Sequence, residues 1–138
     1  MKNIKLRFLA LVILLGGITV ACSLDSDTDN NTCYSSGYAF TTAVSGPDST
    51  KVNVPITINA SFKLENSCGS FNRLVESNSY PKSIAPFVEY NGCNCTTTAT
   101  TLTKPYVFTA PTAGTYELKF QKDAVPTFIT KTIVVTAP

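Results

Sequence analysis

Strict alternation of apolar and polar residues from Lys51 to Glu65 is the clearest pattern in the chain. Apolar side chains occupy every second position from Val52 to Leu64, and polar residues or Pro55 stand between them. A period of two buries one set of side chains on one face and leaves the other set in solvent. We therefore predict one long strand here, with an edge or a bulge at Pro55, which has no N–H to donate.

Other β-prone segments follow at a spacing of roughly ten residues, which is typical of a sandwich of short strands. They are Tyr38–Val44, Ile84–Tyr90, Thr96–Thr103 with its continuation Tyr106–Thr109, Tyr116–Phe120 and Phe128–Thr136. Turn residues such as Gly46-Pro47 and Asn91-Gly92 separate them, and no helical stripe of useful length is present. We predict an all-β domain over residues 33–138, an antiparallel β-sandwich of about seven strands.

The first 21 residues have the three parts of a secretory signal peptide. Lys2, Lys5 and Arg7 form a positive start, and an uncharged, mostly apolar run of fourteen residues extends from Phe8 to Ala21. Fourteen residues are too few to span a bilayer, for which a helix needs ~20. A buried core helix or a short anchor is the alternative, and charge, length and exit all disfavour it.

The exit of this segment, Thr19-Val20-Ala21-Cys22, resembles the lipobox of bacterial lipoproteins, with Thr19 where that pattern usually has Leu. The resemblance implies that Cys22 becomes the mature N-terminus and carries a diacylglyceryl group and a third acyl chain. Two or more acyl chains anchor a protein stably in a bilayer. The lipid bilayer is therefore the first expected partner of the chain.

Residues 22–32 are predicted to be the lipidated cysteine and a flexible acidic tether, since a polar, negatively charged run cannot bury enough surface to order itself. The run also resembles the Ser/Asp-rich export signal of surface lipoproteins of Bacteroidota. We expect an outer-membrane, lipid-anchored protein that is exposed at the cell surface. A periplasm-facing position is the alternative.

The segment Ala113-Gly114-Thr115-Tyr116 resembles the G-x-Y start of the penultimate strand of immunoglobulin-like domains, where the Tyr makes a corner hydrogen bond. Leu118 stands where antibody-type domains have a core Cys, which disfavours that subfamily. With the turns at Asn66–Phe71 and Gly92–Cys95, the region from about Tyr38 to Pro138 resembles small Ig-like surface lipoproteins of Bacteroidota. That group has no established activity, so the resemblance implies an Ig-like fold and an envelope location only.

Four cysteines remain in the predicted domain: Cys33, Cys68, Cys93 and Cys95. An even number in an exported domain predicts two disulfides. A Cys93–Cys95 bond would close a strained ring, so two pairings remain, and we favour Cys33–Cys95 with Cys68–Cys93. Because successive strands alternate in direction, we expect all four at the pole of the sandwich where the tether enters.

Four thiolates at one pole are also a possible site for Zn²⁺ or Cu(I). The chain lacks the two C-x₂-C pairs of a zinc ribbon, and an oxidising export route favours disulfides. We therefore predict no bound metal and no cofactor, with a thiolate metal-binding lipoprotein as the alternative function.

Charge and composition bear on which chemistries are expected. Without residues 1–21, eight basic residues face nine acidic ones, a net charge of −1, which does not suit a nucleic-acid partner. The chain contains no His, which excludes His-dependent hydrolase triads, and its carboxylates are scattered. No Gly-rich phosphate loop is present. We predict a non-enzymatic protein with no catalytic residues.

The pole opposite the cysteines is expected to present the loops Ser45–Thr50, Ser77–Lys82 and Ala110–Gly114. Exposed loops on a rigid sandwich are the usual place for recognition. Our candidate ligand residues there are Asp48, Ser49 and Tyr80. Asp48-Ser49-Thr50 also resembles the O-glycosylation acceptor of Bacteroidota, for which an ordinary polar turn is the alternative.

Four tyrosines are candidates for stacking on sugars: Tyr34, Tyr38, Tyr80 and Tyr90. We expect most of them instead to fill the core with the hydroxyl at its rim. The function predicted from the sequence is a membrane-anchored envelope lipoprotein that acts as a binding or interaction module for an unknown protein or glycan. A passive structural or accessory envelope protein is the remaining alternative.

Overall fold

The structure, a computed structural model, describes residues 33–125 and 127–138. The predicted signal peptide, Cys22 and tether lie outside the described residues. Nine strands and no helix occur in the described part of the chain. They are β1 Tyr34–Tyr38, β2 Thr41–Ser45, β3 Ser49–Lys51, β4 Ile56–Leu64, β5 Gly69–Glu76, β6 Lys82–Asn91, β7 Thr100–Phe108, β8 Gly114–Gln121 and β9 Phe128–Thr136.

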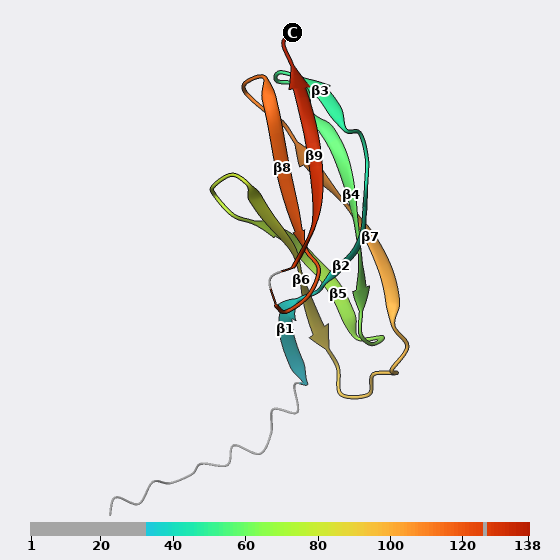
Figure 1. The fold of residues 1–138 in the computed structure, drawn as a ribbon. Coiled ribbons are helices and arrows are strands. Elements are labelled where there is room, and N and C mark those ends of the chain that lie inside the picture. The colour runs from blue at the N-terminus through green and yellow to red at the C-terminus, as the bar shows by residue number, and fades with distance from the viewer. Residues whose placement is uncertain (1–32, 126) are drawn as a thin grey trace, which may run out of the picture. The chain divides into compact units, whose positions relative to one another are not determined.

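The strands form two sheets, which confirms the all-β prediction (Figure 1). The six-stranded sheet runs β1-β6-β8-β9-β3, with β5 paired to β6 as well, and the three-stranded sheet runs β2-β4-β7. Two details differ from the prediction. Nine strands are described instead of about seven, and the larger sheet is mixed, because β3 runs parallel to β9 and β6 runs parallel to β8.

The core lies between the two sheets and takes side chains from both. Its larger cluster of buried residues comprises Ile58, Ala60, Ile84, Phe108, Ala110, Leu118, Phe120, Ile133 and Val135. A smaller cluster, made of Ala39, Phe62, Leu64 and Val88, lies toward the ends of β4 and β6. Burial of apolar surface is worth roughly 25 cal/mol per Å², so these side chains hold the sheets face to face.

The long strand predicted from Lys51 to Glu65 is two strands that belong to different sheets. Lys51 ends β3, and the amide of Val54 donates back to the carbonyl oxygen of Lys51 in a turn whose Asn53 has φ 61°. Pro55 then precedes β4. The alternation is confirmed for β4, where the even-numbered side chains from Ile58 to Leu64 are buried. Before Ile56 the prediction of a continuous strand was wrong. Asn53 adopts the left-handed conformation, which Asn tolerates, and the turn around it takes the chain from the larger sheet to the smaller one.

The predicted strand from Tyr38 to Val44 also changes sheet. β1 pairs with β6 up to Tyr38, and the chain then crosses to pair with β4 as β2. The amide of Ala39 donates to the carbonyl oxygen of Pro86 over 2.9 Å, but Pro86 has no N–H with which to return the bond. The β1–β6 ladder therefore ends at Pro86, where the chain crosses between the sheets.

Strand β5 was not predicted. Its segment Gly69–Glu76 is mostly polar and only partly buried, and a bulge interrupts its register between Phe71 and Arg73. A bulge breaks the period of two that identifies strands in a sequence.

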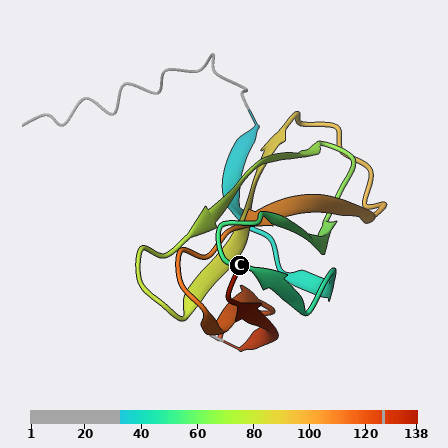
Figure 2. The same ribbon diagram turned by 90° about the horizontal axis from the view of Figure 1, so that it is seen from above.

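Seen from above, β1 lies toward the upper margin of the view and the red strands β8 and β9 toward the lower margin (Figure 2).

Candidate binding groove beside the first strand

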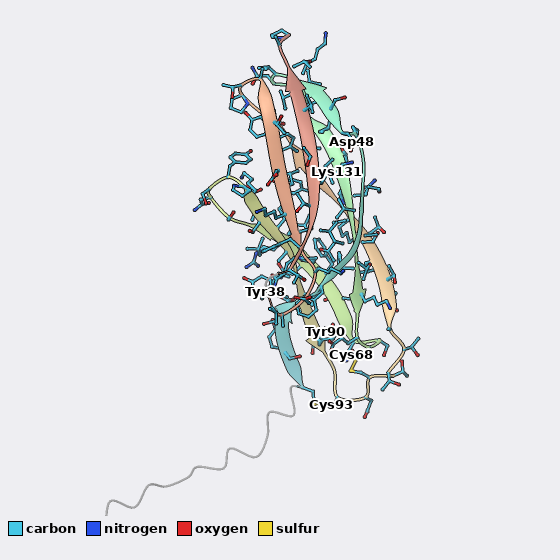
Figure 3. All side chains as sticks on the ribbon, in the orientation of Figure 1. Tyr38, Asp48, Cys68, Tyr90, Cys93 and Lys131 are labelled. Carbon is cyan, nitrogen blue, oxygen red and sulfur yellow. A yellow bond between two sulfur atoms is a disulfide. The ribbon has the colours of Figure 1, made fainter. Side chains whose placement is uncertain are left out.

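Two disulfides, Cys33–Cys93 and Cys68–Cys95, brace one end of the sandwich, with Cα–Cα distances of 4.9 and 5.4 Å. The prediction of two disulfides at one pole is confirmed, and the labelled Cys68 and Cys93 lie at the same end (Figure 3). The favoured pairing was wrong. Cys33 precedes β1 and so lies at the far end of β6, where the amide of Gly92 donates to its carbonyl oxygen. Cys93 therefore comes within bonding distance of Cys33 and leaves Cys95 to Cys68.

Gly92 lies beside the disulfides at a position where any other residue would be strained. Its φ of +136° lies in a region that side chains disfavour, and a Cβ built there would stand 2.9 Å from the sulfur of Cys68. The amide of the preceding Asn91 donates to the carbonyl oxygen of Cys68 over 3.2 Å. Backbone and sulfur therefore pack together in the Asn91-Gly92 turn.

Residues 33–125 and 127–138 contain neither a metal-ion cluster nor a membrane-spanning helix. Within these ranges no three His, Cys, Asp or Glu side chains come together in an arrangement suited to a metal ion. The same residues include no helix long and apolar enough to cross a membrane. All four cysteines of the predicted domain are in disulfides, so their sulfurs are not thiolate ligands in this state.

The candidate ligand residues Asp48 and Ser49 lie along the edge of the larger sheet. The ammonium of Lys131 on β9 forms an ion pair with Asp48 and donates to the carbonyl oxygen of Gly46 over 2.8 Å (Figure 3). Ser49 begins β3 and pairs in register with Val134, with its side chain exposed. The hydroxyl of Thr50 donates to the carbonyl oxygen of Val54. This part of the predicted loop is therefore a strand held to β9.

The third candidate, Tyr80, lies in the loop between β5 and β6, on the other side of β9 from Asp48. Tyr80 is 48% exposed, and its ring makes an edge contact with that of Tyr116 at 5.2 Å between centroids. The Tyr116 hydroxyl donates to the carbonyl oxygen of Thr112 over 3.0 Å. The structure thus contains the hydrogen bond expected from the G-x-Y segment, but it does not bring Tyr80 and Asp48 into one site.

A groove of about 440 Å³ opens beside β1, between the larger sheet and the end of β4. The groove-lining residues are Ser35, Ser36, Gly37, Tyr38, Ala39, Phe40, Thr42, Lys63, Leu64, Glu65, Val88, Tyr90 and Ala99. It exists because the chain leaves the larger sheet after Tyr38 and joins β4 only from Thr41 onward. Below that crossover, β1 and the last residues of β4 have no strand between them.

The groove combines an apolar interior with aromatic and hydroxyl groups. Buried Leu64 and Val88 belong to the smaller core cluster and also line the groove. A Cβ at Gly37 would meet no atom within 4 Å, so this glycine leaves the groove open. Tyr38 is 52% exposed and packs edge-on against Phe87. An apolar cavity with a few polar groups at its rim is the usual form of a binding site.

Tyr90 lies on β6, next to β1, and joins the larger sheet to the end of β4 at the groove (Figure 3). Its hydroxyl accepts a hydrogen bond of 3.1 Å from the backbone amide of Glu65. The interpretation that tyrosines fill the core with the hydroxyl at the rim therefore fits Tyr90. It does not fit Tyr34, Tyr38 and Tyr80, because each of these is about half exposed.

The seam between β5 and β7 is closed by polar side chains. The Glu76 carboxylate accepts hydrogen bonds from the Lys82 ammonium at 2.8 Å and from the Tyr106 hydroxyl at 2.5 Å. The bond from Lys82, followed by the bond from Tyr106, lowers the pKa of Glu76 below its ordinary value of 4.5. Burial, reinforced by Glu76, raises the pKa of Tyr106, so its hydroxyl keeps the donated proton.

Sequence reasoning named two groove residues, Tyr38 and Tyr90, as sugar-stacking candidates but did not bring them together. They sit on adjacent antiparallel strands, and a sequence does not show that the chain changes sheet between Tyr38 and Thr41. The available signal was the small, uncharged run Ser35-Ser36-Gly37 between two tyrosines.

No protein-family model, curated protein or solved structure matches this chain.

Proposed function

We propose that this chain is a non-enzymatic, lipid-anchored envelope lipoprotein whose Ig-like sandwich acts as a binding or interaction module, with the groove beside β1 as its contact surface. The groove is the observation that carries the binding part of the proposal. It has an apolar interior and hydroxyl groups at its mouth. Of its two tyrosines, Tyr38 is half exposed and Tyr90 has its hydroxyl bonded at the rim.

The anchoring part of the proposal is supported by the sequence of residues 1–22, with its positive start, apolar run and lipobox-like exit. The protein would sit in the outer membrane and be exposed at the cell surface, the periplasm-facing position being the alternative. The bond from Tyr116 to Thr112 supports the Ig-like type, since a tyrosine corner is a feature of that fold. The parallel pairing of β6 with β8 is a variation on it.

Lipidation is tested by producing the full chain in a bacterium with two membranes and measuring the mass of its N-terminal peptide. The expected peptide begins at Cys22 and carries the acyl groups, and a Cys22→Ser variant should leave the membrane fraction. Protease treatment of intact cells then separates the two locations. A chain that retains residues 1–21, or that has an unmodified Cys22, would contradict the anchoring part of the proposal.

Binding at the groove is tested with a photo-crosslinking amino acid at Lys63, which lines the groove. Thr101 provides the matched control, because it lies directly opposite Lys63 in the β4–β7 ladder and does not line the groove. We expect a discrete adduct from position 63 that is absent from position 101. Equal labelling at both positions, or no adduct at either, would favour the passive structural role.

The thiolate metal-binding alternative is tested on the same preparation. An intact mass four hydrogens below the reduced value, with no alkylation, supports two disulfides among Cys33, Cys68, Cys93 and Cys95. Four alkylatable thiols together with bound metal would support the alternative instead.

A further inference from the structure

Strands at the margin of a sheet carry unpaired backbone groups, and proteins usually protect them with charge, Pro, bulges or short length. Four marginal strands in the described part of the chain have such protection. β2 and β5 have bulges, β7 contains Lys104-Pro105, and β3 has only three residues, one of them Lys51. β1, with the sequence Tyr-Ser-Ser-Gly-Tyr, has no charge, no Pro and no bulge.

The register of β1 shows which of its backbone groups are unpaired. The amide of Ala39 donates to Pro86, and the amide of Gly92 donates to Cys33. Backbone bonds alternate along an antiparallel pair, so Cys33, Ser35, Gly37 and Ala39 bond toward β6. The N–H and C=O groups of Tyr34, Ser36 and Tyr38 therefore point away from β6, where no described strand pairs with β1.

The side chains of the same three residues share one face. Tyr38 packs against Phe87 on the outer face of the sheet, whereas Ala39 faces the core. Since side chains alternate along a strand, Tyr34, Ser36 and Tyr38 lie on the outer face together. Both tyrosines are more than half exposed, at 54% and 52%, and they stand two residues to either side of Ser36.

We propose that two copies of this chain pair through β1, antiparallel, with Ser36 on the twofold axis. In that register Tyr34 lies opposite Tyr38 of the second copy, and Ser36 lies opposite its own counterpart. The N–H and C=O groups of all three residues point away from β6, so each of them can form a hydrogen bond with the residue opposite it in the second copy. The arrangement also makes two cross-strand tyrosine pairs, which stabilise antiparallel strands. No charged side chain of β1 opposes another.

This inference rests on the proposed function, because the second copy would lie along the mouth of the same groove. One short strand and two tyrosine pairs bury less surface than the roughly 800 Å² per partner of a standard interface. Pairing is therefore weak in dilute solution. Anchoring both copies in one bilayer raises their effective concentration and favours the pair without any new contact.

The test uses the full chain in bacterial membranes with Ser36→Cys and a mild oxidant. Residues opposite each other in a hydrogen-bonded pair have Cα atoms about 5.5 Å apart, within the range of a disulfide. We expect a covalent dimer that reduction reverses. Ser35→Cys is the matched control, because the proposed register places Ser35 opposite Gly37 of the second copy rather than opposite Ser35.

A second pair of variants tests the edge without adding a thiol. Ser36→Pro removes the outward N–H, so it should abolish the dimer that a chemical crosslinker traps in intact membranes and preserve the melting temperature. Ser35→Pro removes an N–H that bonds toward β6 and should lower the melting temperature. These measurements distinguish loss of pairing from loss of folding.

The outcomes of these experiments distinguish failure of pairing through β1 from failure of binding at the groove. A reversible dimer from Ser36→Cys but not from Ser35→Cys, with loss of the chemically trapped dimer in Ser36→Pro, supports pairing through β1. A monomer in every sample, or equal crosslinking of the two cysteine variants, overturns it. If the crosslinker at Lys63 meanwhile captures a different protein, the groove remains a binding site and only the second-copy proposal fails.

Discussion

The ammonium of Lys131 on β9 contacts both the carboxylate of Asp48 and the carbonyl oxygen of Gly46, two groups that precede β3. The amide of Val134 donates to the carbonyl oxygen of Asp48 over 2.8 Å, which adds a backbone bond to the same connection. The Asp48 side chain is largely exposed, whereas that of Lys131 is largely covered. Lys131 thus holds the chain as it leaves the smaller sheet and joins the edge of the larger one.

From this geometry we predict that Lys131→Met costs about 1–2 kcal/mol of unfolding free energy, since a charged group would no longer bond the Gly46 carbonyl. Asp48→Asn should change stability by only about 0.5 kcal/mol, because exposed ion pairs contribute little. Urea denaturation of the two variants gives both values. An equal effect of the two substitutions would contradict the view that the backbone contact matters more than the ion pair.

Gly92 and Gly37 form a second comparison. Gly92→Ala places a Cβ 2.9 Å from the sulfur of Cys68 at a φ of +136°, and should destabilise the fold by about 1–3 kcal/mol. Gly37→Ala meets no atom within 4 Å and should be neutral within about 0.5 kcal/mol. Thermal denaturation monitored by circular dichroism checks both. A neutral Gly92→Ala would show that the turn between β6 and the disulfides is looser than described.

The hydroxyl of Thr41 is buried without a hydrogen-bond partner, and Thr41 is 1% exposed. Replacing it with Val keeps the shape and removes the unpaired group, so we expect Thr41→Val to stabilise the protein by about 1 kcal/mol. The neighbouring Thr42 donates its hydroxyl to the carbonyl oxygen of Ser61 over 3.1 Å, so Thr42→Val should not stabilise it. A lower melting temperature for Thr41→Val would indicate that a water molecule pairs with this hydroxyl.

The pKa of Glu76 is lowered by its bonds from Lys82 and Tyr106, which links stability to pH. A carboxyl whose pKa is lower in the folded state adds stability at pH values above its unfolded pKa. That stability is lost as pH falls through the folded pKa. We therefore expect Glu76→Gln to melt below the wild type at neutral pH, with a gap that shrinks as pH drops below 4.5. A gap independent of pH would mean that the carboxylate charge is not what matters.

The prediction from sequence succeeded where the local pattern and the tertiary environment agree. The alternation in β4 was readable because one face of the strand packs on the core and the other faces solvent. It failed where the chain changes sheet, at Asn53 and at Ala39, because alternation continues across the change while the partner strand does not. The bulged β5 gave no periodic signal at all.

The candidate site was harder to predict than the fold. The end at which the cysteines gather followed from strand direction, but choosing between Cys93 and Cys95 required the register of β1 on β6. The groove depends on where β1 ends. Pro86 ends the ladder between β1 and β6, but the sequence alone does not show that Ala39 lies opposite Pro86. The two tyrosines of the groove were recognisable as candidates, but their position on neighbouring strands depends on pairing between residues far apart in the sequence.

The bond between Cys33 and Cys93 also determines how the domain would respond to a pull. Cys33 directly precedes β1, and a load arriving from the N-terminal side would otherwise reach the larger sheet only through the backbone bonds between β1 and β6. The disulfide passes that load directly to the end of β6, which is also paired with β5 and β8. Tension would then act along the middle of the larger sheet, and many bonds would have to break together before the sandwich opened.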